Sequence, residues 1–429
     1  MIKINSQIKN KLMFKNDDNK YIYADYIGTG QPVPIVENYI LTNILPFYAN
    51  VHSNSKGSLM MTQCIDETKD YIRKVMNMSP DQKLIFTGNG ATGAINHIVN
   101  SINYNKFIQV NIIISNYEHY SNHIPWVEKS KIYSNIKLFF IPVTKEGIID
   151  YNFLNTLCNK LSKNSNILNI ISVTACSNVT GIITDINKIK KIIASTNPNI
   201  KLFLDYATLS PYKKINAQLS DAIFISPHKL LGGAQTPGIL IANKNLFMND
   251  CPFIPGGGCV KNLNNNEIVY EEDIEIKETA GTPNIIGVIR IKLALLLKES
   301  FINTIEHNEK FITKYIHNRF KDLLSRHSNL HVIFLNKQIE NRLPIICIYI
   351  DDCHHNTIVK ILNNHFGIQT RGGIACCGLF AKFMKQHYNI TGWCRITFYW
   401  LMNIEEIEYI INAVAYISQY HTHLNKYTT

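Results

Sequence analysis

The amino-acid sequence predicts an α/β fold, with a mostly parallel central sheet, helices on both of its faces and a smaller α+β unit. From about residue 83 onward, short apolar runs rich in Ile, Val and Phe alternate with amphipathic stretches. Such runs, bounded by Gly, Asn, Ser or Pro, are typical of buried strands of a parallel sheet. Their alternation with helical stretches is typical of α/β folds. Around residues 285–326 the pattern changes to one long helical segment.

The strands and helices can be placed one by one along the chain. In order, the expected strands of the central sheet are KLIFTG, FIQVNIIIS, IKLFFIPV, ILNIISVTA, IKLFLDYA, DAIFISPH and GILIAN. The segments between them include GAINHIVNSIN and INKIKKIIAS, in which apolar residues recur at helical spacing. After the long helical segment, the expected strands are LPIICIYI and CRITFYW, and the expected helices are HNTIVKILNNHFGI and EEIEYIINAVAYISQY.

The composition is that of a folded protein in a reducing compartment. Of 429 residues, 46% are apolar and 17% charged, which excludes disordered, collagen-like and disulfide-stapled proteins. The ten cysteines lack the C-x-x-C spacing of a zinc site, so we expect no metal site. The stretch MIKINSQIKNKLMF has no apolar core of a signal peptide, and no apolar run approaches the ~18 residues of a membrane span. We therefore expect a soluble, cytoplasmic protein.

The chain is basic, with a net charge of +11 from 43 Lys and Arg against 32 Asp and Glu. A basic balance is one mark of nucleic-acid-binding proteins. Here, however, the lysines are scattered among Asn and Ile, in runs such as INKIKKII, and form no dense basic block. We therefore favour a bias in composition, and nucleic-acid binding on an enzyme-like scaffold is the less favoured alternative.

Polar residues gather at the carboxyl ends of several expected strands, which is the edge where open α/β sheets bind ligands. The first strand leads into GNGAT, a turn that enters a helix and offers backbone N–H groups to a phosphate. The other strand ends carry Glu118, His119, Ser177, Asn178, Asp205, Ser226, His228 and Lys229. Each of these residues alone has an ordinary structural explanation, but together they predict a binding site.

Several motifs give the chain a resemblance to a known family. They are ISPHKLLGG, PGGGCV, AGTPN, RGGIACCG and the Cys-Arg pair at 394–395. With them the chain resembles the class V aminotransferase family of pyridoxal-phosphate enzymes, which includes cysteine desulfurases and selenocysteine lyases. The resemblance runs from YADYIGTG near residue 23 to GWCRITFYW at 392–400 and implies the PLP-dependent transferase fold type I. The implied parts are an N-terminal segment packing with the small domain (1–30), a large PLP-binding domain (31–285) and a small C-terminal α+β domain (286–429).

The resemblance assigns cofactor roles to the residues at the strand ends. Lys229 matches the lysine that holds pyridoxal 5′-phosphate as a Schiff base, and we expect burial to lower its pKa. Asp205 matches the aspartate that keeps the ring nitrogen protonated, which makes the ring an electron sink. His119 matches the catalytic residue stacked on the ring, and Asn178 matches the residue that reaches the phenolic oxygen. The remaining expected cofactor contacts, chiefly to the phosphate, are Gly90, Ala91, Thr92, Ser226 and His228.

Further residues match positions for the substrate and for a second subunit. Thr282, in AGTPN, matches a position that contacts the phosphate of the neighbouring subunit, so the resemblance implies a homodimer with shared sites. Arg395 matches the arginine that binds the substrate's α-carboxylate, for which a permanently charged, two-pronged guanidinium is suited. Arg371 is either a second anchor or a brace for its loop. Asn178 is also an expected substrate contact.

Cys376 is the residue that discriminates among members of the family. In RGGIACCG it falls where a desulfurase branch with a short loop places its nucleophile, whose thiolate attacks the sulfur of cysteine. The adjacent Cys377 is the alternative nucleophile, and simple packing is the alternative role of both. The histidines that precede the nucleophile in one desulfurase branch are Ile374 and Ala375 here, which removes candidate acid–base groups. Thr208 stands where the family has glutamine, and it is long enough for one hydrogen bond to the ring oxygen.

The sequence thus predicts a pyridoxal-phosphate-dependent cysteine desulfurase. It would convert L-cysteine to alanine and leave a persulfide on Cys376, and a sulfur-acceptor protein is a candidate partner. The alternative is a class V aminotransferase, or a selenocysteine or β-lyase, that acts on another amino acid without a cysteine nucleophile.

Overall fold

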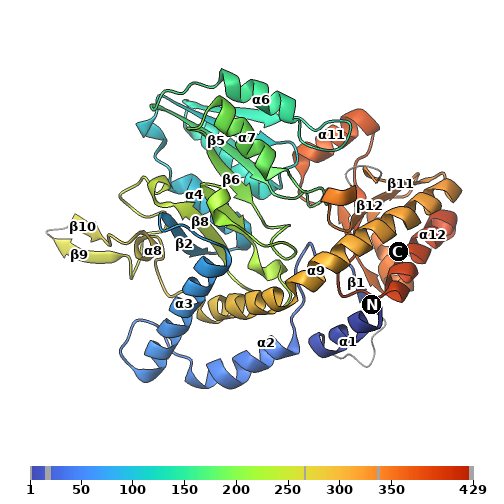
Figure 1. The fold of residues 1–429 in the computed structure, drawn as a ribbon, viewed down its shortest axis with the longest axis horizontal. Helices are drawn as coiled ribbons and strands as arrows, with labels where there is room; N and C mark the ends of the chain where they lie inside the picture. The colour runs from blue at the N-terminus through green and yellow to red at the C-terminus, as the bar shows by residue number, and fades with distance from the viewer. Residues whose placement is uncertain (1, 15–20, 265–266, 336–338, 425–429) are drawn as a thin grey trace.

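The fold is built on a seven-stranded central sheet (Figure 1). A computed structural model describes residues 2–14, 21–264, 267–335 and 339–424. The strand order is β2-β8-β7-β6-β5-β3-β4. The strands are β2 (Gln82–Thr87), β3 (Gln109–Ser115), β4 (Ile136–Ile141), β5 (Ile167–Thr174), β6 (Lys201–Asp205), β7 (Ala222–Ile225) and β8 (Gly238–Asn243). β8 runs antiparallel to the other six strands of this sheet, which are parallel to one another, so the predicted, mostly parallel arrangement is confirmed.

Helices cover both faces of this sheet because its strands are apolar on both sides. Ile112 and Ile114 of β3 pack with α4 and α5, whereas Ile113 between them packs with α6 and α7 on the opposite face. All three isoleucines are fully buried, as expected for a parallel sheet covered on both sides. The helices of this part are α2 (Pro34–Tyr39), α3 (Lys56–Val75), α4 (Gly90–Ser101), α5 (Ile124–Ile132), α6 (Tyr151–Lys160), α7 (Ile186–Thr196) and α8 (Ile274–Lys277).

A second, antiparallel sheet has the strand order β11-β12-β15-β14. This part contains β11 (Leu330–Val332), β12 (Ile345–Ile350), α10 (His355–Phe366), β13 (Ile368–Gln369), β14 (Arg371–Gly373), α11 (Gly378–Tyr388), β15 (Trp393–Thr397) and α12 (Ile404–Leu424). The register places Arg371 of β14 directly opposite Arg395 of β15. Residues opposite each other in an antiparallel pair share a face, so the sheet brings the two guanidinium groups together.

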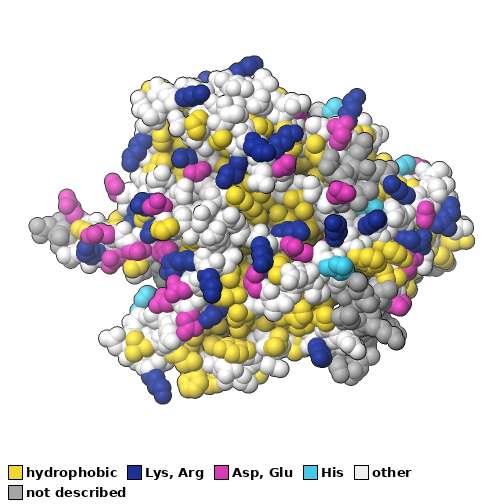
Figure 2. Space-filling model, in the orientation of Figure 1, with side chains coloured by type: hydrophobic (Ala, Val, Ile, Leu, Met, Phe, Trp, Pro, Cys, Tyr) yellow, Lys and Arg dark blue, Asp and Glu magenta, His cyan; other side chains and the backbone are white. Residues whose placement is uncertain are grey.

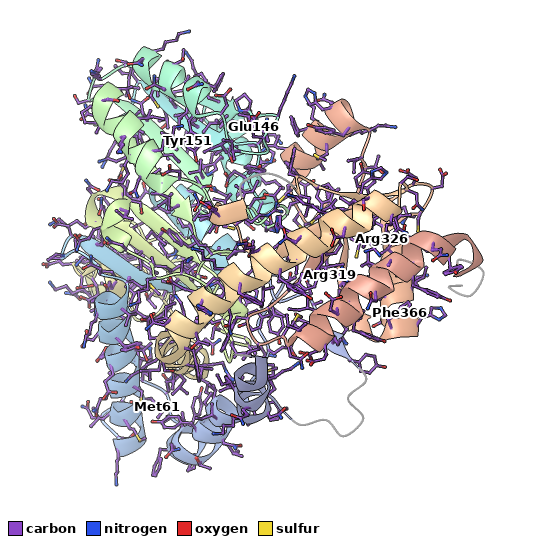
Figure 3. The ribbon with its side chains drawn as sticks, turned by 45° about the vertical axis from the view of Figure 1, so that its right-hand side comes forward. Met61, Glu146, Tyr151, Arg319, Arg326 and Phe366 are labelled. Atoms are coloured by element: carbon purple, nitrogen blue, oxygen red, sulfur yellow. The ribbon has the colours of Figure 1, made fainter. Side chains whose placement is uncertain are left out.

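One 42-residue helix, α9 (Ile285–Arg326), runs along both parts of the fold (Figure 1). The Asn284 side chain caps its first turn by accepting a hydrogen bond from Gly287 N at 2.9 Å. Toward its other end, Arg319 donates to both carboxylate oxygens of Glu408 on α12 at 2.7 Å; Figure 3 shows Arg319 beside α12. The predicted long helical segment is thereby confirmed, whereas the domain boundaries drawn from the resemblance stay predictions.

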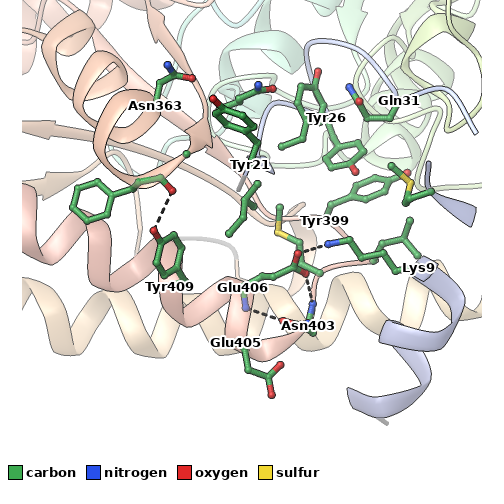
Figure 4. Close-up of a pocket in the computed structure, with 18 of the residues that line it drawn as sticks. Lys9, Tyr21, Tyr26, Gln31, Asn363, Tyr399, Asn403, Glu405, Glu406 and Tyr409 are labelled. Atoms are coloured by element: carbon green, nitrogen blue, oxygen red, sulfur yellow. Dashed lines mark hydrogen bonds and ion pairs between the residues drawn. The ribbon is translucent and has the colours of Figure 1, made fainter. Parts of the chain in front are cut away.

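The amino-terminal residues lie against the second sheet. β1 (Ile22–Tyr23) pairs in parallel with β13, and Thr397 N donates to Ala24 O at 2.8 Å. The helix α1 (Ile2–Leu12) reaches α12, where Lys9 pairs with Glu406. A cavity of about 980 Å³ opens between these segments (Figure 4). Its tyrosines are Tyr21, Tyr23, Tyr26, Tyr399 and Tyr409.

The remaining elements are short. β9 (Val260–Asn264) and β10 (Glu267–Tyr270) form an antiparallel pair that projects from the body of the molecule (Figure 1). The short helical turns are η1 (Ile40–Ile44), η2 (Leu45–Phe47), η3 (Tyr104–Lys106), η4 (Tyr120–Asn122), η5 (Ala217–Leu219), η6 (Pro227–Lys229), η7 (Lys244–Leu246) and η8 (Ile339–Asn341). Within the described ranges, none of the helices combines the length and apolar character needed to cross a bilayer.

Candidate active site

A cavity of about 210 Å³ lies at the carboxyl ends of the central strands and is closed by residues of the second sheet. It is lined by Ile27, Gly28, Asn89, Ala91, Thr92, His119, Ser121, Thr174, Asn178, Asp205, Ala207, Thr208, Ser226, His228, Lys229, Arg371, Ala375, Cys376 and Arg395. The structure therefore gathers most of the residues predicted from separate strand ends. Gly90 and Thr282 line a neighbouring cavity of about 910 Å³, which shares Asn89 and His228 with the first.

Asp205 is the last residue of β6 and is almost fully buried. Its Oδ1 accepts a hydrogen bond from Ala207 N at 2.8 Å. Burial raises the pKa of this carboxyl, and the Ala207 hydrogen bond and the nearby Lys229 ammonium oppose that rise. A buried carboxylate is stable only beside compensating charge or hydrogen-bond donors. Asp205 therefore favours a cationic group in the cavity.

Lys229 ends the turn η6, directly after β7. Burial lowers the pKa of its amine to about 8. The Asp205 carboxylate opposes this shift, while the guanidinium groups of Arg395 and Arg371 add to it. A large share of the amine is thus neutral near pH 8, and the neutral amine is the form that attacks a carbonyl carbon. The burial of Lys229 agrees with the cause from which the lowered pKa was predicted.

We expect covalent uptake of pyridoxal 5′-phosphate by the cofactor-free chain to quicken with rising pH and to level off above about 8. For an ordinary lysine, with a pKa of ~10.4, the rate of uptake would still rise about tenfold per pH unit in that range. The measurement is the change in visible absorbance after mixing, followed over a pH series. A rate that keeps climbing through pH ~10 would show that the Lys229 pKa is not lowered.

The amino-terminal end of α4 forms an anion-binding cradle. Gly90 has φ of +55°, and a Cβ there would lie 2.7 Å from Ser226 Oγ, so the position requires glycine. Ser226 Oγ accepts from Ala91 N at 2.8 Å, and the Asn89 side chain makes no capping bond to any described residue. Thr92 Oγ1 lies 2.6 Å from Ser121 Oγ. Backbone N–H groups and hydroxyls around a helix N-terminus favour a phosphate.

His119 presents a neutral ring to the cavity. Its Nδ1 accepts a hydrogen bond from Ser121 N at 3.1 Å and lies 3.0 Å from Ser121 Oγ. Burial lowers the pKa of the imidazole to about 4, and the charges of Lys229 and Arg395 lower it as well. An uncharged flat ring at neutral pH is suited to stacking on another ring.

Arg395 lines the cavity, and hydrogen bonds to neighbouring residues hold its guanidinium in place. Its Nη2 donates to Asp25 Oδ1 at 2.6 Å, and its Nη1 donates to the Asn178 backbone oxygen at 3.1 Å. Arg371 Nε donates to Asp25 Oδ2 at 2.9 Å, so one carboxylate bridges the two guanidinium groups. Arg395 Nε is buried and finds no acceptor among the described residues. A guanidinium that lines a cavity is suited to a carboxylate ligand.

Asp25 was not predicted as a site residue, although it lies in the YADYIGTG stretch. Its partners are 346 and 370 positions away in the sequence, so only the tertiary fold brings them together. The available signal was local: Asp25 is the one charged residue between positions 21 and 36. Such an isolated charge in a largely uncharged segment indicates a partner elsewhere in the chain.

Cys376 lies at the tip of a tight turn. Ala375 and Cys376 have φ of +52° and +57°, and Cys377 N donates to Ile374 O at 3.1 Å, which is the pattern of a type I′ turn. Tyr120 N donates to Cys376 O at 2.7 Å, which ties the turn to the central part of the fold. The Cys376 side chain is exposed and lines the cavity, whereas that of Cys377 is buried.

The turn predicts opposite effects for one substitution at two nearby alanines. Ala375→Gly is expected to raise the free energy of unfolding by about 1 kcal/mol, because the left-handed conformation costs about 1–2 kcal/mol for an L-residue. Ala381→Gly, in the interior of α11, is the matched control and is expected to lower it by about 1 kcal/mol. Urea unfolding of both variants is the measurement, and equal losses would contradict the turn geometry.

Glu118 is a fully buried carboxyl whose role was not predicted from the sequence. It accepts hydrogen bonds from Ser115 Oγ, from Asn122 Nδ2 at 2.6 Å and from Thr174 N at 3.0 Å. Burial raises its pKa to about 8, so it is mostly neutral at pH 7. These bonds join the ends of β3 and β5. Because His119 follows Glu118 in the sequence, they also position His119.

The comparisons with known proteins agree on one family. A family model described as Aminotransferase class-V matches residues 22–410. The chain is 29% identical over 414 residues to a probable cysteine desulfurase of Borreliella burgdorferi, covering 93% of this chain and 92% of that protein. It is 26% identical over 415 residues to a cysteine desulfurase of Wigglesworthia glossinidia brevipalpis, covering 95% of each.

Solved structures share the fold. The apo cysteine desulfurase of Thermococcus onnurineus NA1 superposes with a TM-score of 0.81 at 21% identity, covering 94% of this chain and 95% of the other. The S-sulfonic acid form of the Escherichia coli cysteine desulfurase CsdA gives a TM-score of 0.79 at 20% identity and covers 99% of each chain. The predicted α/β fold is thereby confirmed.

Proposed function

The chain belongs to the class V aminotransferase family of pyridoxal-phosphate enzymes, and on that premise we propose that it is a cysteine desulfurase acting on L-cysteine. The observation that carries the proposal is the exposed thiol of Cys376 in the same cavity as Lys229 and Arg395. These three groups are the nucleophile, the amine and the carboxylate anchor that sulfur removal from an amino acid requires. The names of the relatives support the same activity.

The cavity fits pyridoxal 5′-phosphate. The cradle at Gly90, which has no room for a side chain, suits the phosphate, together with Ala91, Thr92, Ser226 and His228. Asp205 suits the protonated ring nitrogen, and His119 suits the ring face. Asn178 and Thr208 are assigned to the ring oxygen in the proposal, and Lys229 to the aldehyde. When bound, the cofactor supplies an electron sink for negative charge that develops on the substrate.

In the proposed reaction each residue has one task. Arg395 orients the substrate by binding its α-carboxylate, and Asp25 holds the Arg395 guanidinium in place. Lys229, with a pKa of about 8, moves the proton at the substrate's α-carbon. The Cys376 thiolate attacks the substrate sulfur, so that an S–S bond forms and the substrate's C–S bond breaks. The sum is Cys376–SH plus L-cysteine giving Cys376–S–SH plus L-alanine.

Product analysis with a Cys376→Ala variant tests this function. We expect the unaltered enzyme to release alanine from L-cysteine and to gain one sulfur atom in its mass. Loss of the nucleophile is expected to lower alanine production by about 10³-fold or more while cofactor absorbance is kept. A variant with full activity would exclude the nucleophile. Turnover that needs a keto-acid acceptor, with no persulfide, would identify an aminotransferase instead.

We also propose a homodimer with shared active sites. Apolar side chains gather over α2 and the segment that follows it, as Figure 2 shows at the lower edge of the molecule. The exposed members are Ile35, Tyr39, Leu41, Leu45, Phe47, Tyr48 and Leu59. A contiguous patch of this kind marks an interaction surface. Thr282 lines the cavity next to the candidate site, and the proposal assigns it to a partner's phosphate.

Light scattering after gel filtration tests the dimer, whose mass is twice the 49.1 kDa of one chain. Leu41→Glu is expected to shift the enzyme to monomer, because it places a charge inside the proposed interface. Ile132→Glu on α5 is the matched control, since Ile132 is 68% exposed and Leu41 60%. Monomer in both variants, or in neither, would contradict this surface. The proposal also includes a cytoplasmic location, because ten free cysteines are typical of a reducing compartment. Its last part is a sulfur-acceptor protein as partner.

A further inference from the structure

Cys377 adjoins the proposed nucleophile but has the opposite environment. The Cys376 side chain is exposed to the cavity, whereas Cys377 is fully buried. The Cys377 thiol donates a hydrogen bond to Asn178 Oδ1, with 2.8 Å between sulfur and oxygen. Burial raises the pKa of the Cys377 thiol well above its ordinary value, so the thiol keeps the hydrogen that it donates.

Asn178 connects this thiol to the rest of the candidate site. Its Nδ2 donates to Ala375 O at 2.9 Å, in the turn that carries Cys376. Its backbone oxygen accepts from Arg395 Nη1 at 3.1 Å. The two side-chain bonds specify one orientation of the amide, because the reverse orientation would place Oδ1 against the Ala375 carbonyl oxygen. Asn178 therefore joins the Cys376 turn to the arginine of the carboxylate site.

We propose that Cys377 is a positioning residue, whose thiol fixes the Asn178 amide and thereby the place of Cys376 in the cavity. The inference rests on the proposed desulfurase function and adds to it a residue that does not touch the substrate. If Cys377 lacked its donor, Asn178 Oδ1 would be left buried without a partner. The amide would then be free to turn, and the Nδ2 bond that holds Ala375 would weaken with it.

Burial of the Cys377 thiol, which raises its pKa, protects the persulfide from this neighbour. A Cys377 thiolate would attack the Cys376 sulfur, form a Cys376–Cys377 disulfide and break the bond to the outer sulfur. The outer sulfur would leave as hydrogen sulfide after taking up a proton, so it is reduced while the Cys377 sulfur is oxidised. Only a thiolate attacks in this way. A buried, protonated thiol that donates to Asn178 therefore leaves the persulfide intact.

The test compares Cys377→Ala, which removes the donor, with Cys377→Ser, which keeps one. In the cofactor-free protein, the rate of iodoacetamide alkylation at Cys376 is expected to rise about threefold or more in the alanine variant and to return toward the original rate with serine. In the loaded enzyme, alanine is expected to lower kcat about tenfold with little change in KM for cysteine, and serine to restore it. Cys158→Ala, at an equally buried thiol on α6, controls for loss of a cysteine.

Two results would overturn the proposal: alkylation and kcat unchanged in Cys377→Ala, or the same loss in the serine as in the alanine variant. Localisation of the persulfide to Cys377 by tandem mass spectrometry would overturn it as well. If the alanine variant does not fold, Cys377→Val also lacks the donor and takes its place. The alkylation rates need neither cofactor nor cysteine. Absence of alanine from the unaltered enzyme would therefore reject the desulfurase function without deciding the positioning role.

Discussion

Lys229→Ala is expected to lower alanine production from L-cysteine by about 10³-fold or more and to abolish covalent attachment of the cofactor. The variant removes the amine of η6 that the structure places in one cavity with Asp205, Arg395 and residues of the anion cradle. It also removes the group proposed to move the proton at the substrate's α-carbon. The measurements are product release and the visible absorbance of the purified enzyme.

Lys298→Ala is a demanding control for this result. Lys298 is also buried, and burial lowers its pKa to about 8, the same value as for Lys229. It lies on α9, however, and donates to Lys213 O at 2.6 Å, outside the candidate site. The control variant is expected to keep its absorbance and rate. Equal loss in both variants would mean that a buried lysine of lowered pKa, rather than the position of Lys229, explains the effect.

Arg395→Lys is expected to lower kcat/KM for cysteine by about 10²-fold, mainly through a higher KM. A lysine keeps the positive charge beside Asp25, but it has no planar fork with which to bind Asp25, Asn178 O and a substrate carboxylate together. The substitution removes the guanidinium that lines the cavity. Initial rates over a range of cysteine concentrations give the two constants.

Arg371→Lys provides the comparison for that substitution. Arg371 binds the same Asp25 carboxylate, but its side chain is 50% exposed. Its substitution is therefore expected to change KM by less than about tenfold. If both substitutions raised KM equally, the two arginines would act as one anchor, and the assignment of Arg395 alone would be wrong.

The sequence was sufficient for the parts of the fold that depend on local pattern. The runs IKLFLDYA and DAIFISPH correspond to β6 and β7, because apolar runs of strand length have few other stable arrangements. Asp205, at the end of β6, and Lys229, shortly after β7, could be brought together in advance because parallel strands end at one edge. The antiparallel direction of β8 could not be predicted, since an apolar run such as GILIAN can pair with its neighbours in either direction.

The features that were missed depend on contacts between distant segments. Ala375 and Cys376 occupy a turn that usually selects glycine or asparagine, so their sequence gave no turn signal. The turn forms because Tyr120 and Asn178 hold it from another part of the chain. The bridging role of Asp25 was missed for the same reason.

Asp25 makes the amino-terminal segment part of the candidate site. Proteolytic removal of the residues through β1 and Asp25 would spare Lys229, Asp205 and Cys376. It would nevertheless remove the Asp25 carboxylate that Arg395 and Arg371 share. Two positive charges would then face each other across β14 and β15. A shortened chain of this kind would retain the chemical groups for catalysis while discriminating poorly between amino acids and other amines.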